Sequence, residues 1–165
     1  MQFLLLNSTK NKDGFVVVLS EIMDPHNLGS IIRVCECAGA DGIIIGKDRS
    51  ASVSDTVMRI SAGALNHIKV AKVTNINIAI DKLKDNGFWV YGAEVGGSNI
   101  YKSNLTGKIC LVIGGEDSGV KRLTKEKCDG VISIPMFGKV SSLNASVACG
   151  IAIYEVVRQR VLDNK

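Results

Sequence analysis

Three separated stretches of the sequence carry the residue types that bind and position ligands. They are DPHNLGSIIRV from Asp24, GGEDSGV from Gly114 and PMFGKVSSLN from Pro135. Each stretch combines glycine, which lets a ligand approach the backbone closely, with amide, hydroxyl, carboxylate or guanidinium groups. This combination is typical of a pocket that orients a polar ligand through a few directed hydrogen bonds.

The first stretch predicts a helix start with an unusual arginine. Asp24 or Asn27 can cap the helix, and Pro25 suits the turn before it. Arg33 lies among apolar residues, and Gly29, one turn earlier on the same face, leaves room for an incoming group. Arg33 is therefore a candidate ligand contact, with a solvated arginine as the alternative.

The second stretch places two glycines directly after an apolar run. Their backbone groups can face a ligand, and Glu116 is the first side chain able to orient it. A solvated acidic turn is the alternative interpretation of Glu116 and Asp117. The glycine order fits neither a dinucleotide fingerprint nor a Walker A loop, so an NAD oxidoreductase is only a distant alternative.

The third stretch and the residue before it combine apolar and polar side chains. Ile134, Met136 and Leu143 offer flat apolar contact for a purine-like ring, while Ser142 and Asn144 offer directed donors and acceptors. Asn144 can also cap the helix that follows. That helix is apolar almost all round, which predicts that its second face meets another subunit.

Length and composition favour one compact domain, since 46% of the 165 residues are hydrophobic. The formal net charge of +4 is mild but permits a local basic patch that faces phosphate. Five cysteines without zinc-binding spacing predict reduced thiols in the cytoplasm and no metal site. No apolar run is long enough for a membrane span, and no signal peptide pattern is present, so we expect no membrane partner.

Short β-branched runs alternate with helical patterns along the chain. We expect strands at 15–20, 42–46, 67–73, 88–93, 109–115 and 130–135. We expect helices at about 28–38, 54–61, 75–86, 120–127 and 144–162. The alternation predicts a parallel α/β sheet with helices on both faces and a ligand site at the carboxyl ends of the strands.

Three fragments together resemble the ordered motifs of the SpoU (TrmH) class of the SPOUT superfamily. They are DPHNLGSIIRVCECAGADGI, LVIGGEDSGV and ISIPMFGKVSSLNASVACGIAIYEVVRQR, and the resemblance covers the chain from about Phe15 to Arg160. Members are ribose 2'-O-methyltransferases of ribosomal or transfer RNA that use S-adenosylmethionine. The resemblance therefore implies an α/β knot in the carboxyl-terminal segment and a homodimer formed through the knot and the last helix.

The resemblance also implies roles for individual residues. The implied catalytic set is Asn27, Arg33, Glu116, Ser142 and Asn144. The implied cofactor contacts are Gly114, Ile134 and Leu143, with Met136, Ala93, Glu94 and Asn144 beside them. Arg33 would either accept the proton of the ribose hydroxyl or grip the phosphate next to it.

The fragments KRLT, ISIPM and SSLN are most similar to members that methylate a guanosine of 23S ribosomal RNA. We expect that substrate, with transfer RNA as the alternative. Lys121, Arg122 and Lys139 lie near the motif loops and are expected, with Arg33, to contact the RNA. The competing interpretation is a non-catalytic RNA-binding module, and retention of the implied arginine, glutamate and asparagine favours the enzyme.

Many relatives carry a separate RNA-recognition domain ahead of the catalytic one. This sequence has only MQFLLLNSTKNKDG before the first expected strand, so we expect a single catalytic domain over residues 1–165. The sequence leaves open whether this is a minimal enzyme or an isolated catalytic domain.

Overall fold

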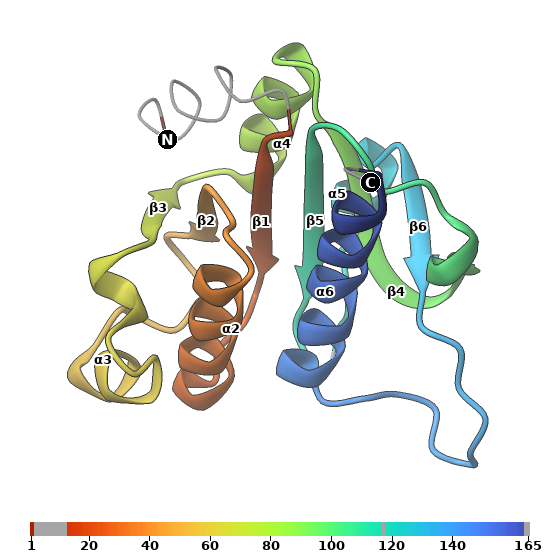
Figure 1. Ribbon diagram of the computed structural model, residues 1–165. Coiled ribbons are helices and arrows are strands. Elements are labelled where there is room, and N and C mark those ends of the chain that lie inside the picture. The colour runs from red at the N-terminus through yellow and green to blue at the C-terminus, as the bar shows by residue number, and fades with distance from the viewer. Residues whose placement is uncertain (2–12, 117, 164–165) are drawn as a thin grey trace.

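A computed structural model describes residue 1, residues 13–116 and residues 118–163 of the chain (Figure 1). Within these ranges the strands are β1 (Phe15–Ser20), β2 (Gly42–Gly46), β3 (Lys69–Val73), β4 (Trp89–Asn99), β5 (Ile109–Gly114) and β6 (Gly130–Ser133). The α-helices in the same ranges are α2 (Pro25–Cys37), α3 (Asp55–Ile60), α4 (Ile76–Asp85), α5 (Arg122–Lys127) and α6 (Ala145–Asp163).

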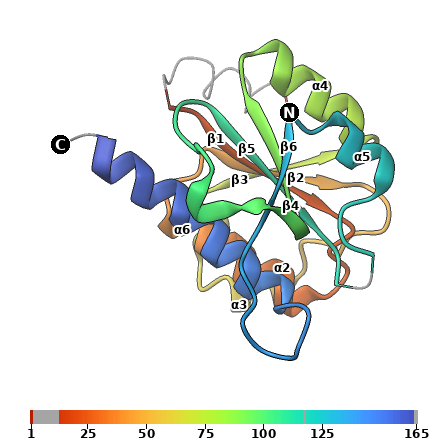
Figure 2. The ribbon, with the colours of Figure 1, turned by 90° about the vertical axis from the view of Figure 1, so that its right-hand side faces the viewer.

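The strands form one parallel sheet in the order β3-β2-β1-β5-β4-β6. Helices α2, α3 and α6 cover one face, and α4 and α5 cover the other (Figure 2). Along β1, Phe15, Val17 and Leu19 pack on the α2 and α6 side, whereas Val16 and Val18 pack on the α4 side. Both faces of the sheet are buried beneath helices, which explains why β1 is apolar at consecutive positions. This arrangement confirms the predicted sheet with helices on both faces.

Helix α2 begins at Pro25, three residues before its predicted start. Asp24 is the capping residue, because its carboxylate accepts hydrogen bonds from the backbone amides of His26 and Asn27. Proline at the first helical position costs no hydrogen bond, since that amide has no partner within a helix. Of the two predicted caps, the structure therefore selects Asp24.

Strand β4 extends to Asn99, whereas the prediction ended it at Ala93. Both Ala93 and Ser98 pair with Ile132 of β6, so the residues between them leave the sheet and then return. Gly97 permits the return, because a Cβ there would lie 2.6 Å from the carbonyl oxygen of Val131. This excursion forms a wall beside the carboxyl ends of the strands.

The end of β4 and the connection from β4 to β5 contact the carboxyl-terminal segment before and after the loop 134–144. Before the loop, the Ser133 hydroxyl donates to the carbonyl of Gly97 at 2.8 Å. After it, Gln159 on α6 donates to the carbonyl of Ser103 and accepts from the amide of Leu105, at 2.9 and 2.8 Å. The last segment of the chain is therefore fixed against an earlier loop.

Helix α6 buries one face and exposes another. Cys149, Ala152, Ile153 and Val156 are fully buried in the core. Tyr154, by contrast, is half exposed. Although α6 is long, neither it nor another helix in the described part of the chain is apolar over enough length to cross a membrane.

The five cysteines are free thiols, of which Cys35, Cys110 and Cys149 are buried. Burial raises the pKa of Cys35 and of Cys110 well above the usual value. Burial, with Asp129 nearby, raises the pKa of Cys128 to about 11. Because the thiolate is the reactive form, these cysteines behave as small apolar residues at neutral pH.

The prediction that Gly29 leaves room for an incoming group is wrong. Gly29 is buried where α2 packs on α3. A Cβ on Gly29 would lie 2.7 Å from both Cβ and Cγ2 of Ile60. The glycine therefore makes space for α3 and not for a ligand.

Replacing Gly29 by alanine should lower the free energy of unfolding by about 1–3 kcal/mol, because the added methyl overlaps Ile60. Gly150→Ala on α6 is the matched control, since its Cβ would lie 3.9 Å from Val34 and alanine favours a helix by up to about 1 kcal/mol. Urea unfolding of both variants measures the difference. Equal stability changes in the two variants would contradict the packing argument.

Candidate active site

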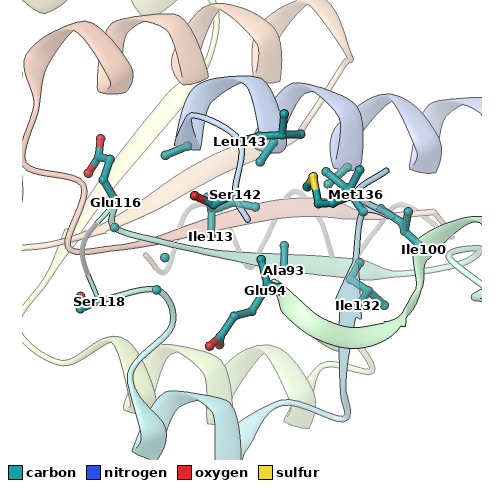
Figure 3. Close-up of a pocket in the computed structure, with 18 residues that line it drawn as sticks. Ala93, Glu94, Ile100, Ile113, Glu116, Ser118, Ile132, Met136, Ser142 and Leu143 are labelled. Carbon is teal, nitrogen blue, oxygen red and sulfur yellow. The ribbon is translucent and has the colours of Figure 1, made fainter. Parts of the chain in front are cut away.

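A cavity of about 360 Å³ opens at the carboxyl ends of β4, β5 and β6, beside the start of α6 (Figure 3). Its volume lies within the range of small-molecule sites. Three segments surround it: the excursion of β4, the loop after β5 and the segment that follows β6. The predicted position of the ligand site, at the carboxyl edge of the sheet, therefore coincides with a cavity.

Gly114 and Gly115, where the loop after β5 begins, present backbone rather than side chains to the cavity. This loop folds back on itself, because the amide of Gly119 donates to the carbonyl of Gly115 at 3.0 Å. A Cβ on Gly114 would overlap the backbone of Gly119 and Val120, and one on Gly115 would lie 2.5 Å from the carbonyl oxygen of Glu21. Only glycine fits at both positions, so this wall can offer peptide groups to a ligand.

The segment after β6 supplies the apolar part of the cavity. Ile134, Met136, Ser142 and Leu143 line it. Between them Phe137 is 97% exposed, so the tip of this loop projects into solvent. Figure 3 shows Met136 and Leu143 on the α6 side of the cavity, across from Glu94.

Glu94 brings a carboxylate to the cavity from the excursion of β4. Its Oε1 accepts from Nζ of Lys125 at 2.9 Å. Its Oε2 is buried and has no hydrogen-bond partner among the described residues. A buried acceptor without a partner is costly, so this oxygen is suited to a donor group on a ligand.

The side chain of Asn27 joins the three motif stretches. Its Nδ2 donates to Oε1 of Glu116, and its Oδ1 accepts from Nδ2 of Asn144 at 3.1 Å. Asn144 also caps α6 as predicted, because its Oδ1 accepts from the amides of Ser146 and Val147 at 3.0 and 3.3 Å. Asn27 is only 7% exposed, so this network fixes α2, the β5 loop and α6 relative to one another.

Most of the predicted site residues meet at this cavity. Those that line it are Ala93, Glu94, Gly114, Glu116, Ile134, Met136, Ser142 and Leu143. Asn27 and Asn144 do not line it but are connected to it through Glu116. Asp117, which accompanies Glu116 in the sequence, lies outside the described residues.

Arg33 is the predicted catalytic residue that a single chain does not bring to the cavity. It is exposed on α2 and lines neither this cavity nor a second one formed by the loops after β1 and β2. At 3.6 residues per turn, Arg33 points about 120° away from Asn27 on the same helix. Asn27 and Arg33 are close together along the chain, but the turn of the helix points their side chains in different directions.

The predicted RNA contacts are distributed around the cavity. Lys121 and Arg122 line the second cavity, and Lys139 is exposed in the loop after β6. Lys125, close to them in sequence, is paired with Glu94. The structure places these cations on the surface near the site.

Some residues that line the cavity were not predicted from the sequence. Ala145, Ala148 and Ala152 lie three and four residues apart on α6, and their small side chains leave space beside β5. That spacing is a sequence signal that could have identified them. Val95 and Ile100 carry no comparable signal, because they reach the cavity only through the excursion of β4.

Comparison with known proteins gives a consistent family. Residues 14–154 match the family model described as SpoU rRNA Methylase. A curated protein of Staphylococcus haemolyticus (strain JCSC1435), assigned to the TrmH family of tRNA/rRNA methyltransferases, is 47% identical over 158 residues. The match covers 94% of this chain and 64% of the relative, so the chain spans less than two thirds of that protein's length.

Solved structures share the fold. The SpoU methyltransferase AviRb from Streptomyces viridochromogenes, in complex with AdoMet, has a TM-score of 0.85 and 31% identity over 94% of this chain and 62% of its own. A TrmH/SpoU tRNA modifying enzyme of A. aeolicus has a TM-score of 0.83 and 28% identity over 99% of this chain and 83% of its own. This likeness confirms the predicted fold class, including the knot that SpoU methyltransferases carry.

The fold and the glycine-walled cavity at the carboxyl edge of the sheet are those of the SPOUT class of α/β proteins. Within that class, the chain belongs to the SpoU rRNA Methylase family.

Asn27→Asp should lower the free energy of unfolding by about 1–3 kcal/mol at neutral pH, because a carboxylate replaces the donor that Glu116 accepts from. Two facing carboxylates raise the pKa of one of them in the folded variant, so its deficit should shrink as the pH falls through that raised pKa. Urea unfolding at neutral and at acid pH measures both effects.

Asn104→Asp is the control for this prediction. The Oδ1 of Asn104 accepts from the amide and the hydroxyl of Thr106, and a carboxylate keeps both bonds. The control should therefore retain its stability at neutral pH. A deficit in Asn27→Asp that does not change with pH would contradict the proposed pairing with Glu116.

Proposed function

We propose that this chain is an S-adenosylmethionine-dependent methyltransferase domain that acts on a ribose 2'-hydroxyl of RNA. The observation that carries the proposal is the convergence of three separated motif stretches at one cavity, joined through Asn27. The AdoMet bound to AviRb and the RNA named for the relatives support the two ligand classes.

The residues of the cavity suit an adenosyl cofactor. Ile134, Met136 and Leu143 offer the apolar contact that an adenine ring needs. The backbone of the loop that begins at Gly114 can offer amide and carbonyl groups, since no side chain fits there. The buried Oε2 of Glu94 would accept a hydrogen bond from a hydroxyl or amino group of the cofactor.

When bound, S-adenosylmethionine supplies an electrophilic methyl group for the ribose oxygen. The protein then mainly orients the two reactants and places charge. Asn27, Glu116 and Asn144 hold the loops in position, and Ser142 presents a hydroxyl at the cavity. These residues and Arg33 form the proposed catalytic set.

Two roles are open for Arg33 at the ribose oxygen. It would act either as the proton acceptor or as a clamp on the neighbouring phosphate. A guanidinium stays protonated in proteins, which favours the clamp, with the hydroxyl proton passing to phosphate or water. A bidentate contact with phosphate would also stabilise the negative charge that develops on the ribose oxygen.

We propose that the active form is a homodimer. Arg33 lies outside the cavity of its own chain, so a second protomer is needed to supply an arginine to each site. On α6, Val147 and Tyr154 are each 50% exposed, and a partner would cover them. Helices α2 and α6 cover the same face of the sheet, so both observations support an interface that includes α6 (Figure 2).

For the substrate, the motif fragments favour a guanosine of 23S ribosomal RNA over a transfer RNA. The proposed phosphate contacts are Lys121, Arg122 and Lys139, together with Arg33. An RNA substrate and five free thiols favour the cytoplasm as the site of action.

The function is tested by incubating the full chain with tritiated S-adenosylmethionine and unmodified bacterial ribosomal or transfer RNA, and then mapping the labelled nucleotide. Label in the ribose of a 23S guanosine is the expected result. Label only in transfer RNA would correct the substrate. Cofactor binding by calorimetry without label in either RNA would support the non-catalytic module, and absence of cofactor binding would refute the proposal.

Gly114→Ala should abolish cofactor binding, because its Cβ overlaps the backbone of Gly119 and opens the loop. Gly138→Ala in the loop after β6 is the matched control, since a Cβ there meets nothing within 4 Å. Calorimetry with S-adenosylmethionine measures both affinities. Wild-type affinity in Gly114→Ala would contradict the assignment of the cavity to the cofactor.

Arg33→Lys should lose most methyl transfer, by about 100-fold or more, because a lysine cannot reproduce a planar bidentate contact. Cofactor affinity should stay unchanged, since Arg33 does not line the cavity of its own chain. Tritiated methyl incorporation and calorimetry measure the two quantities. Full transfer by Arg33→Lys would reject both roles proposed for this residue.

A further inference from the structure

A second cavity, of about 570 Å³, lies at the same carboxyl edge of the sheet. The residues after β1 and β2 and the first residues of α4 and α5 form it. Four of its lining side chains are cations: Lys47, Arg49, Lys121 and Arg122. Lys47 and Arg49 come from the loop after β2, which contains none of the three motif stretches.

The positive charge of this cavity is only partly balanced. Its acidic lining residues are Glu21 and Asp48, against the four cations, and one of these cations, Arg122, is paired with Glu126 beside the cavity at 2.6 Å. Arg49 is exposed over 73% of its side chain. Lys47 is also exposed, and no ion pair of its ammonium group is found within the described ranges. Cations that outnumber carboxylates in a hollow raise the local concentration of anions.

Glu21 holds two of these cations at the wall. Its Oε2 lies 3.2 Å from Nζ of Lys121, and its Oε1 lies 3.5 Å from Nη1 of Arg49. Partial burial raises the pKa of Glu21, but the hydrogen bond and charge of Lys121, followed by those of Arg49, outweigh it and lower the pKa overall. Both distances exceed those of tight charge-assisted hydrogen bonds, so the cations can turn toward a second anion.

The remaining wall favours a phosphate over a free nucleoside. The hydroxyl of Thr124 donates to Oδ1 of Asn77 at 2.9 Å, which leaves the amide nitrogen of Asn77 as a donor. The larger apolar side chains at this wall are Ile76 and Leu123. Two apolar side chains offer little surface to hold a base, whereas the donors and cations match phosphate oxygens.

The loop after β5 is a wall of both cavities. Ser118 lines the first cavity and Lys121 lines the second. Both contact the same oxygen of Glu21, since the Ser118 hydroxyl donates to Oε2 at 3.5 Å. An RNA strand whose ribose reaches the cofactor at the first cavity would therefore carry its neighbouring phosphates over the adjoining surface.

We propose that the second cavity binds backbone phosphate of the substrate RNA next to the target nucleotide, through Lys47 and Arg49 together with Lys121 and Arg122. This inference rests on the proposed RNA methyltransferase function and extends the RNA contact surface to the loop after β2. The site recognises the charge of the phosphodiester backbone. It fixes the position of the RNA strand along the protein and does not distinguish between bases.

The test is Lys47→Ala/Arg49→Ala, measured by fluorescence anisotropy with a short labelled single-stranded RNA over a range of salt concentrations. We expect RNA affinity about tenfold weaker or more, and a salt dependence whose slope is smaller by about 1.4, the value for two lost phosphate contacts. Calorimetry should show unchanged affinity for S-adenosylmethionine.

Lys72→Ala/Lys82→Ala is the matched control. It removes the same charge from exposed positions on β3 and α4 that line neither cavity. The control should bind RNA as the wild type does. This result would distinguish binding at the second cavity from a general effect of lowering the protein's positive charge. Lys47→Arg/Arg49→Lys should restore most of the affinity lost in the double alanine variant, since both positive charges return.

Two results would overturn the inference: equal RNA affinity and salt slope in the double variant and the wild type, or equal losses in the double variant and the control. Loss of binding to free inorganic phosphate without loss of RNA binding would assign the cavity to another ligand. Failure of the proposed function appears separately, as wild-type protein that neither binds S-adenosylmethionine nor labels RNA.

Discussion

The buried side-chain amide of Asn27 is the interaction on which the rest of the site depends. One amide group donates to Glu116 and accepts from Asn144, so it ties helix α2 to the loop after β5 and to the start of α6. These partners lie 89 and 117 residues away along the chain, and no local turn can fix their relation. A carboxylate at this position would repel Glu116, and an apolar side chain would leave both partners unsatisfied. An amide satisfies both partners at once.

The regular part of the fold could be predicted because it depends on local patterns. β1 is apolar at consecutive positions, and the structure covers both of its faces. The extension of β4 beyond Ala93 could not be predicted, because residues 94–97 leave the sheet and the chain returns only where Gly97 meets the backbone of Val131. That contact is non-local, and glycine in a sequence predicts a turn as readily as a return to the sheet.

The site residues that belong to the motif stretches could be predicted from the sequence. The features that depend on the path of the chain, such as the knot, could not. Glu116, Ser142 and Leu143 reach one cavity because their stretches follow β5 and β6, whose carboxyl ends lie at the same edge of a parallel sheet. A knot is an exception to the general rule that chains do not thread their own loops. The prediction of the knot therefore depended on the family resemblance alone. The position of Arg33 could not be predicted from its motif. Arg33 is close to Asn27 in sequence, but the turn of α2 directs its side chain away from the cavity of its own chain.

Glu21 links the two cavities through backbone as well as side chain. Its φ of 61° is unusual for a residue with a Cβ, and the conformation is held because its carbonyl lies against Gly115 while its carboxylate contacts Ser118 and Lys121. Gly115 permits this close approach only while it lacks a side chain. The loop after β5 therefore cannot move at the first cavity without changing a partner of Glu21 at the second. Cofactor and phosphate would thus meet opposite sides of one tightly packed loop, and the position of each would depend on the same glycines.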